Sequence, residues 1–194
     1  PGASASSKTA LKVREAAQEL GYRPNVLARS LITGKSRIIG LVVAYLDNYF
    51  YPAALEKLSN SLKEEGYHVL VFMASNDDQS TEQVIEELLD YQVDGIITAS
   101  VGISNDITAR CEMAGVPVVL FNRNQDSTSH SAVTSDNFLG GQTAARFLCE
   151  SQHKRISYIG GWAGASTQRD REAGFRAGLK KAGKNLFSHA LGNF

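Results

Sequence analysis

From Ile38 onward, apolar and polar positions alternate in blocks along the chain. Short apolar runs are bounded by polar turns, and the stretches between them repeat apolar residues at helical spacing. Strands that are apolar on both faces and separated by amphipathic helices indicate a parallel sheet covered on both sides, a doubly wound α/β architecture. The predicted strands are IIGLVV (38–43), HVLVF (68–72), DGIIT (94–98), VPVVLF (116–121) and RISYIG (155–160). The predicted helical faces are Leu55, Leu58 and Leu62; Val84, Ile85, Leu88 and Leu89; Ile103 and Ile107; and Ala144, Ala145 and Leu148.

The residues before Ile38 follow a different pattern. Between Ser7 and Leu20, apolar residues recur at helical spacing, serines are available as N-caps, and Gly21 stands where the helix is expected to end. Pro24 disfavours a helical conformation at the residue before it and can itself begin a helix, so NVLARSL (25–31) is predicted to be a separate two-turn helix. Such a helix is too short to be stable alone in water and is expected to fold only against a partner.

The segment from Ser131 to Glu150 indicates a change of subdomain. A short predicted strand, SAVTS (131–135), leads into DNFLGG and a helix, and a new strand and a further amphipathic helix follow. The sequence stops before a second sheet of comparable size could be completed. We therefore expect a first lobe at 37–130 and a partial second lobe at 131–194.

Composition places the chain among ordinary globular proteins. With 194 residues, of which 43% are hydrophobic, it can bury a substantial core. It has no run of eighteen apolar residues and no signal-peptide pattern, so the default expectation is a cytoplasmic location. Cys111 and Cys149 lie in separate helical patterns without metal-ligand or redox spacing, and both are expected to be reduced and packed.

Charge is distributed unevenly although the formal net charge is zero. Residues 1–37 hold seven lysines and arginines against two glutamates, whereas the remainder holds 13 basic against 18 acidic residues. A basic segment on an acidic body suggests that the two parts meet different partners, and a polyanion is the usual partner of the basic one. The alternative from charge alone is a solvated basic helix face.

Polar residues follow the predicted strands, at the edge where open parallel sheets place their ligands. Asn122 and Arg123 follow one strand, and the aromatic residues Tyr49, Phe50 and Tyr51 follow another. This mixture of stacking faces and hydrogen-bonding groups suits a sugar, a nucleobase or a similar small polar ligand. Polar residues after strands are also common simply because they form turns, and that interpretation stays open.

Catalytic patterns are weak. The sequence contains no GxSxG, HExxH or GxxxxGK[ST] motif, and GGWAG (160–164) does not have the spacing of a dinucleotide-binding turn. The four histidines are scattered along the chain. We therefore expect no enzymatic activity, no cofactor and no metal site.

Several motifs, taken together and in order, resemble the lactose-repressor/purine-repressor family of bacterial transcription regulators, over about residues 7–181. The junction AAQELGYRPNVLARSLITGKSRIIGLVV (16–43) carries the resemblance most strongly. The others are LDNYFYP (46–52), VDGIITAS (93–100), GVPVVLFNR (115–123), VTSDNFLGG (133–141) and RDREAGFRAGL (169–179). The resemblance implies a helix-turn-helix head, a hinge helix that enters the DNA minor groove, and a dimerising, two-lobed, periplasmic-binding-protein-like body that binds an effector.

Carried over by position, the resemblance implies that residues 1–23 are the end of the helix-turn-helix head and that 24–36 are the hinge helix and linker. Leu31 matches the leucine that wedges between bases, with Ala28 near it on the same face. Asn25 and Arg29 are expected to face phosphate, where contacts position the protein rather than specify sequence. The alternative role for Leu31 is packing between head and body.

The resemblance also implies an effector pocket. Phe50 and Tyr51 match aromatic positions that line the ligand, and Asp136 matches a carboxylate that accepts a hydrogen bond from a sugar hydroxyl. Arg171 matches the arginine that grips the polar edge of the ligand. The remaining expected neighbours of the ligand are Asn122, Arg123 and Asn137.

Relative to the family pattern, the recognition helix and the end of the second lobe are absent, so the sequence resembles a family member truncated at both ends. The leading hypothesis is a DNA-binding repressor controlled by a sugar or sugar derivative, homodimeric and bound to operator DNA in its complete form, with no membrane association. The alternative is a periplasmic-type sugar-binding protein of a transport system, which the basic hinge and the missing signal sequence disfavour. A sugar- or nucleotide-active enzyme is the third class, and it lacks a base or nucleophile at the strand ends.

Overall fold

The computed structural model describes residues 6–23, 30, 32–44, 46–47, 49–75, 78–101, 103–124 and 131–192. The chain divides into two compact units, residues 1–36 and 37–194. In the first unit, the helix α1 (Ser7–Glu19) begins at Ser6, whose hydroxyl accepts a hydrogen bond from the Thr9 amide. Gly21 ends it with a positive φ of 64°, a conformation that glycine adopts without strain. The helix predicted from the periodicity is confirmed, but none of its side chains is buried.

The second unit begins with a five-stranded parallel sheet in the order β2-β1-β3-β4-β5. The predicted parallel sheet is confirmed, and the first predicted strand agrees with β1 to the residue. The strands are β1 (Ile38–Val43), β2 (His68–Met73), β3 (Gly95–Ala99), β4 (Val118–Phe121) and β5 (Ser131–Val133).

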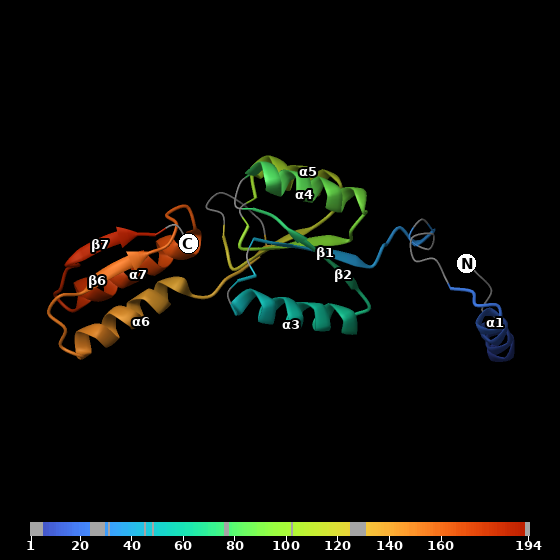
Figure 1. The fold of residues 1–194 in the computed structure, drawn as a ribbon, viewed down its shortest axis with the longest axis horizontal. Helices are drawn as coiled ribbons and strands as arrows, with labels where there is room; N and C mark the ends of the chain where they lie inside the picture. Colours follow the sequence, from blue (N-terminus) through green and yellow to red (C-terminus); the bar gives the residue numbers. More distant parts are fainter. Residues whose placement is uncertain are drawn as a thin grey trace. The chain divides into compact units, whose positions relative to one another are not determined.

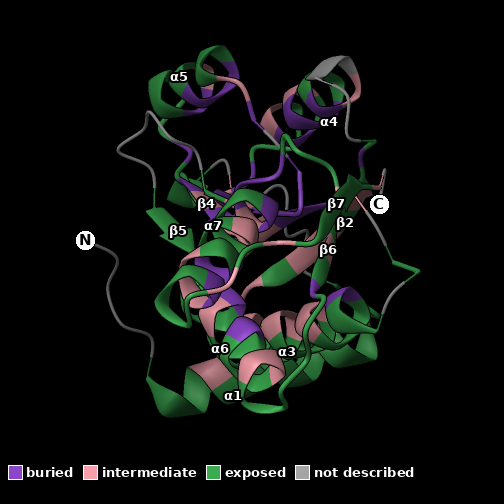
Figure 2. Cartoon of the chain, turned by 90° about the vertical axis from the view of Figure 1, so that its left-hand side faces the viewer, coloured by how far each residue is buried: buried purple, intermediate pink, exposed green. Residues whose placement is uncertain are grey.

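Helices cover both faces of this sheet, as the apolar strands predict. Figure 1 shows α4 (Asp78–Asp90) and α5 (Asn105–Met113) on one face and α3 (Phe50–Glu64) on the other. The larger core lies under α4 and α5, and Figure 2 shows buried residues on the strands and on the inner sides of these helices. A smaller cluster of Val43, Tyr51 and Ala99 lies on the side of α3. We call this sheet with its helices, residues 37–133, the first lobe.

The rest of the second unit forms what we call the second lobe, residues 134–192. Its two parallel strands are covered by a pair of helices that lie side by side (Figure 1). The elements are α6 (Asn137–Glu150), β6 (Ser157–Gly160), α7 (Ser166–Lys181) and β7 (Ser188–Leu191). Its apolar core is small and consists of Ala145, Ile156, Phe175 and Leu179.

Two sequence-based expectations need correction. The segment SAVTS was expected to open the second lobe, but residues 131–133 pair in parallel with β4 and form the fifth strand of the first sheet. A strand of three residues carries no pattern that reveals which sheet it joins. Ala144 was placed on the apolar face of its helix but is exposed, because α6 buries Gly141 and Ala145 instead.

Candidate ligand-binding site

Three of the predicted site residues meet at the carboxyl end of the first sheet. The Tyr51 ring is buried at the start of α3, and its hydroxyl accepts a 2.9 Å hydrogen bond from the Asn122 side-chain amide. Asn122 follows β4 with a φ of 61°, a left-handed conformation that asparagine tolerates better than most residues. The Phe50 ring is half exposed and stacks on Phe121 with 6.0 Å between centroids. We call Phe50, Tyr51 and Asn122 the first-lobe cluster.

The other predicted cluster lies where α6 begins. Asn137 is buried, and its side-chain oxygen accepts a 2.8 Å hydrogen bond from Nε of Arg171 on α7. Within the described residues, the two terminal nitrogens of Arg171 have no hydrogen-bond partner. Asp136 is the N-cap of α6, where Oδ1 accepts a 2.8 Å hydrogen bond from the Leu139 amide. We call Asp136, Asn137 and Arg171 the second-lobe cluster.

Glycines allow this second cluster to form. A Cβ atom on Gly141 would collide with the backbone oxygen of Arg171, and one on Gly174 would collide with the backbone of Phe138. On Gly178 a Cβ would stand 2.7 Å from that of Ala145. The two helix backbones therefore approach closely, which places the start of α6 against the first half of α7 and lets Arg171 reach Asn137.

Arg123, the remaining predicted residue, belongs to neither cluster. Its guanidinium carbon lies 5.3 Å from the ring centroid of Trp162, at a distance typical of a cation–π contact. The next residue, Asn124, donates a 3.0 Å hydrogen bond from its amide to the hydroxyl of Ser166. These two contacts run from the segment after β4 to the loop after β6 and to the first residue of α7, so they connect the first lobe with the second.

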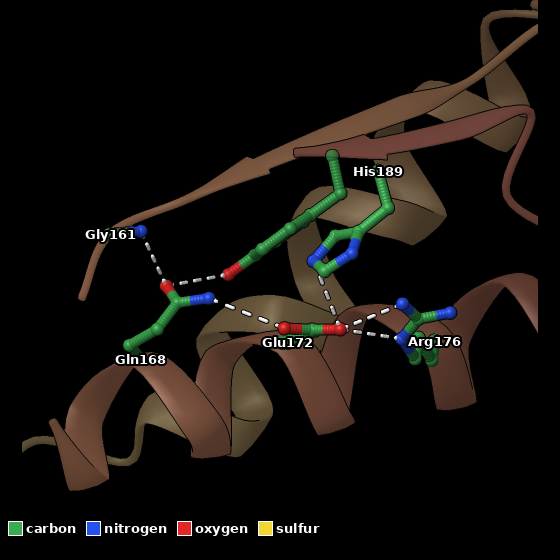
Figure 3. A network of polar contacts seen from close by, with 6 residues as sticks. Gly161, Gln168, Glu172, Arg176 and His189 are labelled. Carbon is green, nitrogen blue, oxygen red and sulfur yellow. Dashed lines mark hydrogen bonds and ion pairs between the residues drawn. The ribbon is translucent and has the colours of Figure 1, made fainter. Parts of the chain in front are cut away.

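A polar network in the second lobe went unrecognised in the sequence (Figure 3). The side-chain oxygen of Gln168 accepts 3.1 Å hydrogen bonds from the Tyr158 hydroxyl and the Gly161 amide. Glu172 accepts from Gln168 at 3.4 Å and from Nε of Arg176 at 2.8 Å. The i, i+4, i+8 spacing of Gln168, Glu172 and Arg176 is a signal that could have been found. Its partners on the strands could not, because they depend on the fold.

The network changes two ionisation equilibria. Burial by itself would raise the pKa of Glu172, but the hydrogen bond from Arg176 and the charge of His189, whose Nε2 lies 3.3 Å from the carboxylate, hold it below its ordinary value. Burial raises the pKa of the Tyr158 hydroxyl, and the hydrogen bond to Gln168 offsets this only in part. Glu172 is therefore a carboxylate at neutral pH and an acceptor for its neighbours.

Comparison with known proteins connects this geometry to a family. Residues 39–189 match the family model described as a periplasmic binding protein domain. The chain belongs to this family. The match covers both lobes, so the predicted periplasmic-binding-protein-like fold is confirmed.

Two curated relatives of the chain are regulators of sugar operons. The sucrose operon repressor of Streptococcus mutans is 36% identical over 143 residues, which are 74% of this chain and 43% of that protein. The maltose regulon regulatory protein MalI of Escherichia coli is 31% identical over 179 residues, 92% of this chain and 52% of that protein. The resemblance to the lactose-repressor/purine-repressor family is thereby confirmed. The chain spans about half the length of these curated relatives.

The fold agrees with that of solved regulators. The structure of the transcriptional regulator CelR in complex with cellobiose has a TM-score of 0.73 to this chain at 26% identity. The comparison covers 98% of this chain and 58% of that one.

Two further observations concern the chemistry available to this family member. In the part of the chain that the structure describes, no three His, Cys, Asp or Glu side chains are grouped so as to hold a metal ion. Within the same residues, no helix is long and apolar enough to cross a membrane. Cys111 is buried and Cys149 half-buried, and both are free thiols as expected. What remains are aromatic faces, amides, one carboxylate and two guanidinium groups, which suit hydrogen bonding and stacking.

The predicted DNA-contact residues lie outside the described residues. They are Asn25, Ala28, Arg29 and Leu31. On either side of them the structure describes α1 and a short turn in which the Gly34 amide donates to the Ser30 oxygen. Their roles in DNA binding therefore stay predictions.

Proposed function

We propose that the complete protein is a DNA-binding transcriptional repressor controlled by a small-molecule effector, a sugar or sugar derivative. The observation that carries this proposal is the pair of clusters: aromatic and amide groups after the strands of the first lobe, and a guanidinium and a carboxylate at the start of α6 and α7. The names of the relatives support it, since they are a sucrose operon repressor and a maltose regulon regulator. A related regulator was solved with cellobiose bound.

Each cluster leaves groups available for a ligand. Asn137 holds Arg171 through Nε, so its terminal nitrogens can donate to two hydroxyls or to a ring oxygen. Asp136 uses Oδ1 as a helix cap, and Oδ2 can accept from a hydroxyl. The half-exposed Phe50 ring offers an apolar face, while the hydrogen bond to Tyr51 orients the Asn122 amide. Polar edges and apolar faces of this kind match the two sides of a sugar ring.

The regulatory part of the proposal concerns residues 1–36. Residues 1–23 would be the end of a helix-turn-helix head, and 24–36 a hinge helix that folds on DNA. Asn25 and Arg29 would contact phosphate, while Leu31, with Ala28 beside it, would wedge between bases in the minor groove. An effector that binds one arrangement of the lobes more tightly would shift the population of that arrangement and so the presentation of paired hinge helices.

This mechanism implies a homodimer that acts on operator DNA in the cytoplasm and catalyses no reaction. The alternative is a sugar-binding protein of a transport system, which shares the fold. The excess of basic residues before Ile38 favours the regulator, because a transport component has no need of a polyanion-binding segment. Operator binding by the complete protein separates the two: Arg29→Ala should weaken binding to all sequences alike and lower the salt dependence.

Isothermal titration calorimetry tests the effector site directly. The panel is sucrose, maltose and cellobiose, the sugars named with the three related regulators above, together with common nucleosides. We expect at least one panel member to bind. Arg171→Ala should weaken that binding at least tenfold, because a lost charged hydrogen bond of roughly 1.4 kcal/mol corresponds to about this ratio.

Arg146→Ala is the matched control, since Arg146 is an exposed arginine on α6 whose partner is Glu150 one turn away. The Arg146→Ala variant should bind the sugar with the same affinity as the unaltered chain. If Arg171→Ala and Asp136→Ala both left every measured affinity unchanged, the assignment of the site would be wrong.

A further inference from the structure

The two lobes are joined by side-chain contacts as well as by the chain itself. Arg123 lies over the indole of Trp162, and the Asn124 amide donates to Ser166. In both pairs one partner follows β4 in the first lobe and the other follows β6 in the second. Trp162 is the only tryptophan of the chain.

The indole of Trp162 is held in place from within the second lobe. A Cβ atom on Gly164 would collide with the six-membered ring, so the ring lies directly against the backbone of that glycine. The Ala165 amide donates a 3.1 Å hydrogen bond to the Trp162 oxygen and closes the turn. One residue earlier, the Gly161 amide donates to the Gln168 side chain on α7. The ring is therefore a fixed surface rather than a freely rotating side chain, although 43% of it is exposed.

The second contact is sensitive to separation of the lobes. Ser166 is buried at the start of α7, with 6% of its surface exposed, and its hydroxyl accepts from Asn124 at 3.0 Å. Separation of the lobes would break this hydrogen bond and replace it with hydrogen bonds to water, so loss of the bond reports the separation. Because Asn124 directly follows Arg123, the cation–π contact and this hydrogen bond should form and break together.

We propose that Arg123 and Trp162 form a clasp that holds the two lobes together beside the effector site, with Trp162 as the residue that positions the Arg123 guanidinium. The clasp stabilises this arrangement of the two lobes, so the effector binds to lobes that are already partly preorganised. The significance of the clasp for regulation rests on the proposed function. The clasp itself is tested without any ligand.

The test uses the 194-residue chain and two readouts. Acrylamide quenching of fluorescence reports the accessibility of Trp162, since no other tryptophan contributes. Hydrogen exchange of the Asn124 amide reports its bond to Ser166. Arg123→Gln should raise the exchange rate by about two- to fivefold, the ratio that a cation–π contact at a partly exposed site provides, and should also raise the quenching constant. Arg123→Lys keeps the positive charge, so both quantities should rise less in this variant than in Arg123→Gln.

Gly164→Ala is the second variant, because it displaces the indole and leaves Arg123 and the fluorophore in the chain. It should accelerate hydrogen exchange at the Asn124 amide as Arg123→Gln does.

Each of the two variants has a control with the same type of substitution at another position. Arg155→Gln removes a cation–π contact with Phe187 that lies wholly within the second lobe, at 5.2 Å. Gly140→Ala adds a Cβ in open space on α6. Neither control should change either readout.

The outcomes separate the clasp from a local contact. Faster exchange at Asn124 in both variants, with unchanged controls and an unchanged circular dichroism spectrum, supports the clasp. Increased quenching with unchanged exchange at Asn124 overturns it, because the ring contact would then not hold the lobes. No change in either readout overturns it as well. If the clasp fails while the Arg171-dependent sugar affinity persists, the proposed function stands. If no panel member binds, fluorescence quenching and amide exchange still test the clasp, because both are measured without ligand.

Discussion

The two lobes are stabilised in different ways. The first lobe buries a large apolar cluster between its five-stranded sheet and the helices α4 and α5. The second lobe has a core cluster of only four buried apolar side chains, brings two helix backbones together at glycines, and adds a polar network around Glu172. Stability in the first lobe should therefore depend on side-chain volume, and in the second on close backbone contact and on charge.

Leu88→Ala should have the largest effect. Leu88 is fully buried in the first-lobe core, and its methyl groups fill the space that a Cβ on Gly40 would occupy. The cavity should lower the free energy of unfolding by about 2–5 kcal/mol, measured by urea denaturation. Leu11→Ala, at an exposed position of α1, is the control and should change little. A loss at Leu88 no larger than at Leu11 would contradict the view of an apolar core.

Gly174→Ala should destabilise the second lobe, although it removes no side chain. The added Cβ would meet the backbone of Phe138, which cannot move aside as a flexible side chain would. We expect a loss of about 1–3 kcal/mol by urea denaturation, in the range of overpacked cores. Gly140→Ala is the matched control and should be neutral or slightly stabilising, because nothing lies within 4 Å of its Cβ position and alanine favours a helix. Equal effects of the two substitutions would refute the close approach.

Glu172→Gln should weaken the second lobe by about 1 kcal/mol, because Arg176 and His189 lose the carboxylate that accepts their hydrogen bonds. Glu150→Gln supplies the control: its partner Arg146 lies 3.9 Å away and both side chains are well exposed. Urea denaturation at neutral pH measures both. If the two variants lost the same small amount, the network would be no more than a surface ion pair.

The same carboxylate predicts a pH dependence. The pKa of Glu172 is lower in the folded protein than its ordinary value, so the unfolded chain takes up a proton first as the pH falls. The stabilisation is complete above the ordinary glutamate pKa of about 4.3 and is lost as the pH falls through the folded-state value. The stability difference between the unaltered chain and Glu172→Gln should therefore shrink in acid. A difference that stays constant to the lowest pH at which both fold would disagree with the lowered pKa.

Tyr51→Phe should lower stability by an amount similar to that expected for Glu172→Gln. It removes the hydroxyl that accepts from Asn122 and keeps the buried ring, so the expected loss is about 0.5–1.5 kcal/mol. Thermal denaturation can follow it. Sugar affinity should fall at the same time, since the Asn122 amide loses the partner that orients it. An unchanged sugar affinity would show that Tyr51 and Asn122 do not belong to the effector site.

Sequence patterns predicted the first lobe better than the second. Continuous apolar runs identify buried parallel strands, and the run 38–43 coincides with β1. The strand at 131–133 was assigned to the wrong lobe, because a three-residue exposed strand has no distinguishing pattern. The helix pair of the second lobe depends on which glycines face each other, for example Gly174 against Phe138, and this is a property of two segments together.

The candidate site shows the same limit. The resemblance selected Asn137 and Arg171 individually, and the structure adds that they bond to each other. It selected Arg123 as a neighbour of the ligand, whereas the contact of its guanidinium with Trp162 follows from the spatial arrangement of two strand ends. Pairwise geometry of this kind cannot be derived from the spacing of residues along one chain.

The central claim is that one ligand engages both lobes, and hydrogen–deuterium exchange with the sugar that binds in calorimetry tests it most directly. A ligand shared by the two lobes should protect the segments around Tyr51 and Asn122 in the first lobe and those around Asn137 and Arg171 in the second at the same time. Both protections should disappear in Arg171→Ala and persist in Arg146→Ala. Protection confined to one lobe, or located away from both clusters, would contradict the claim.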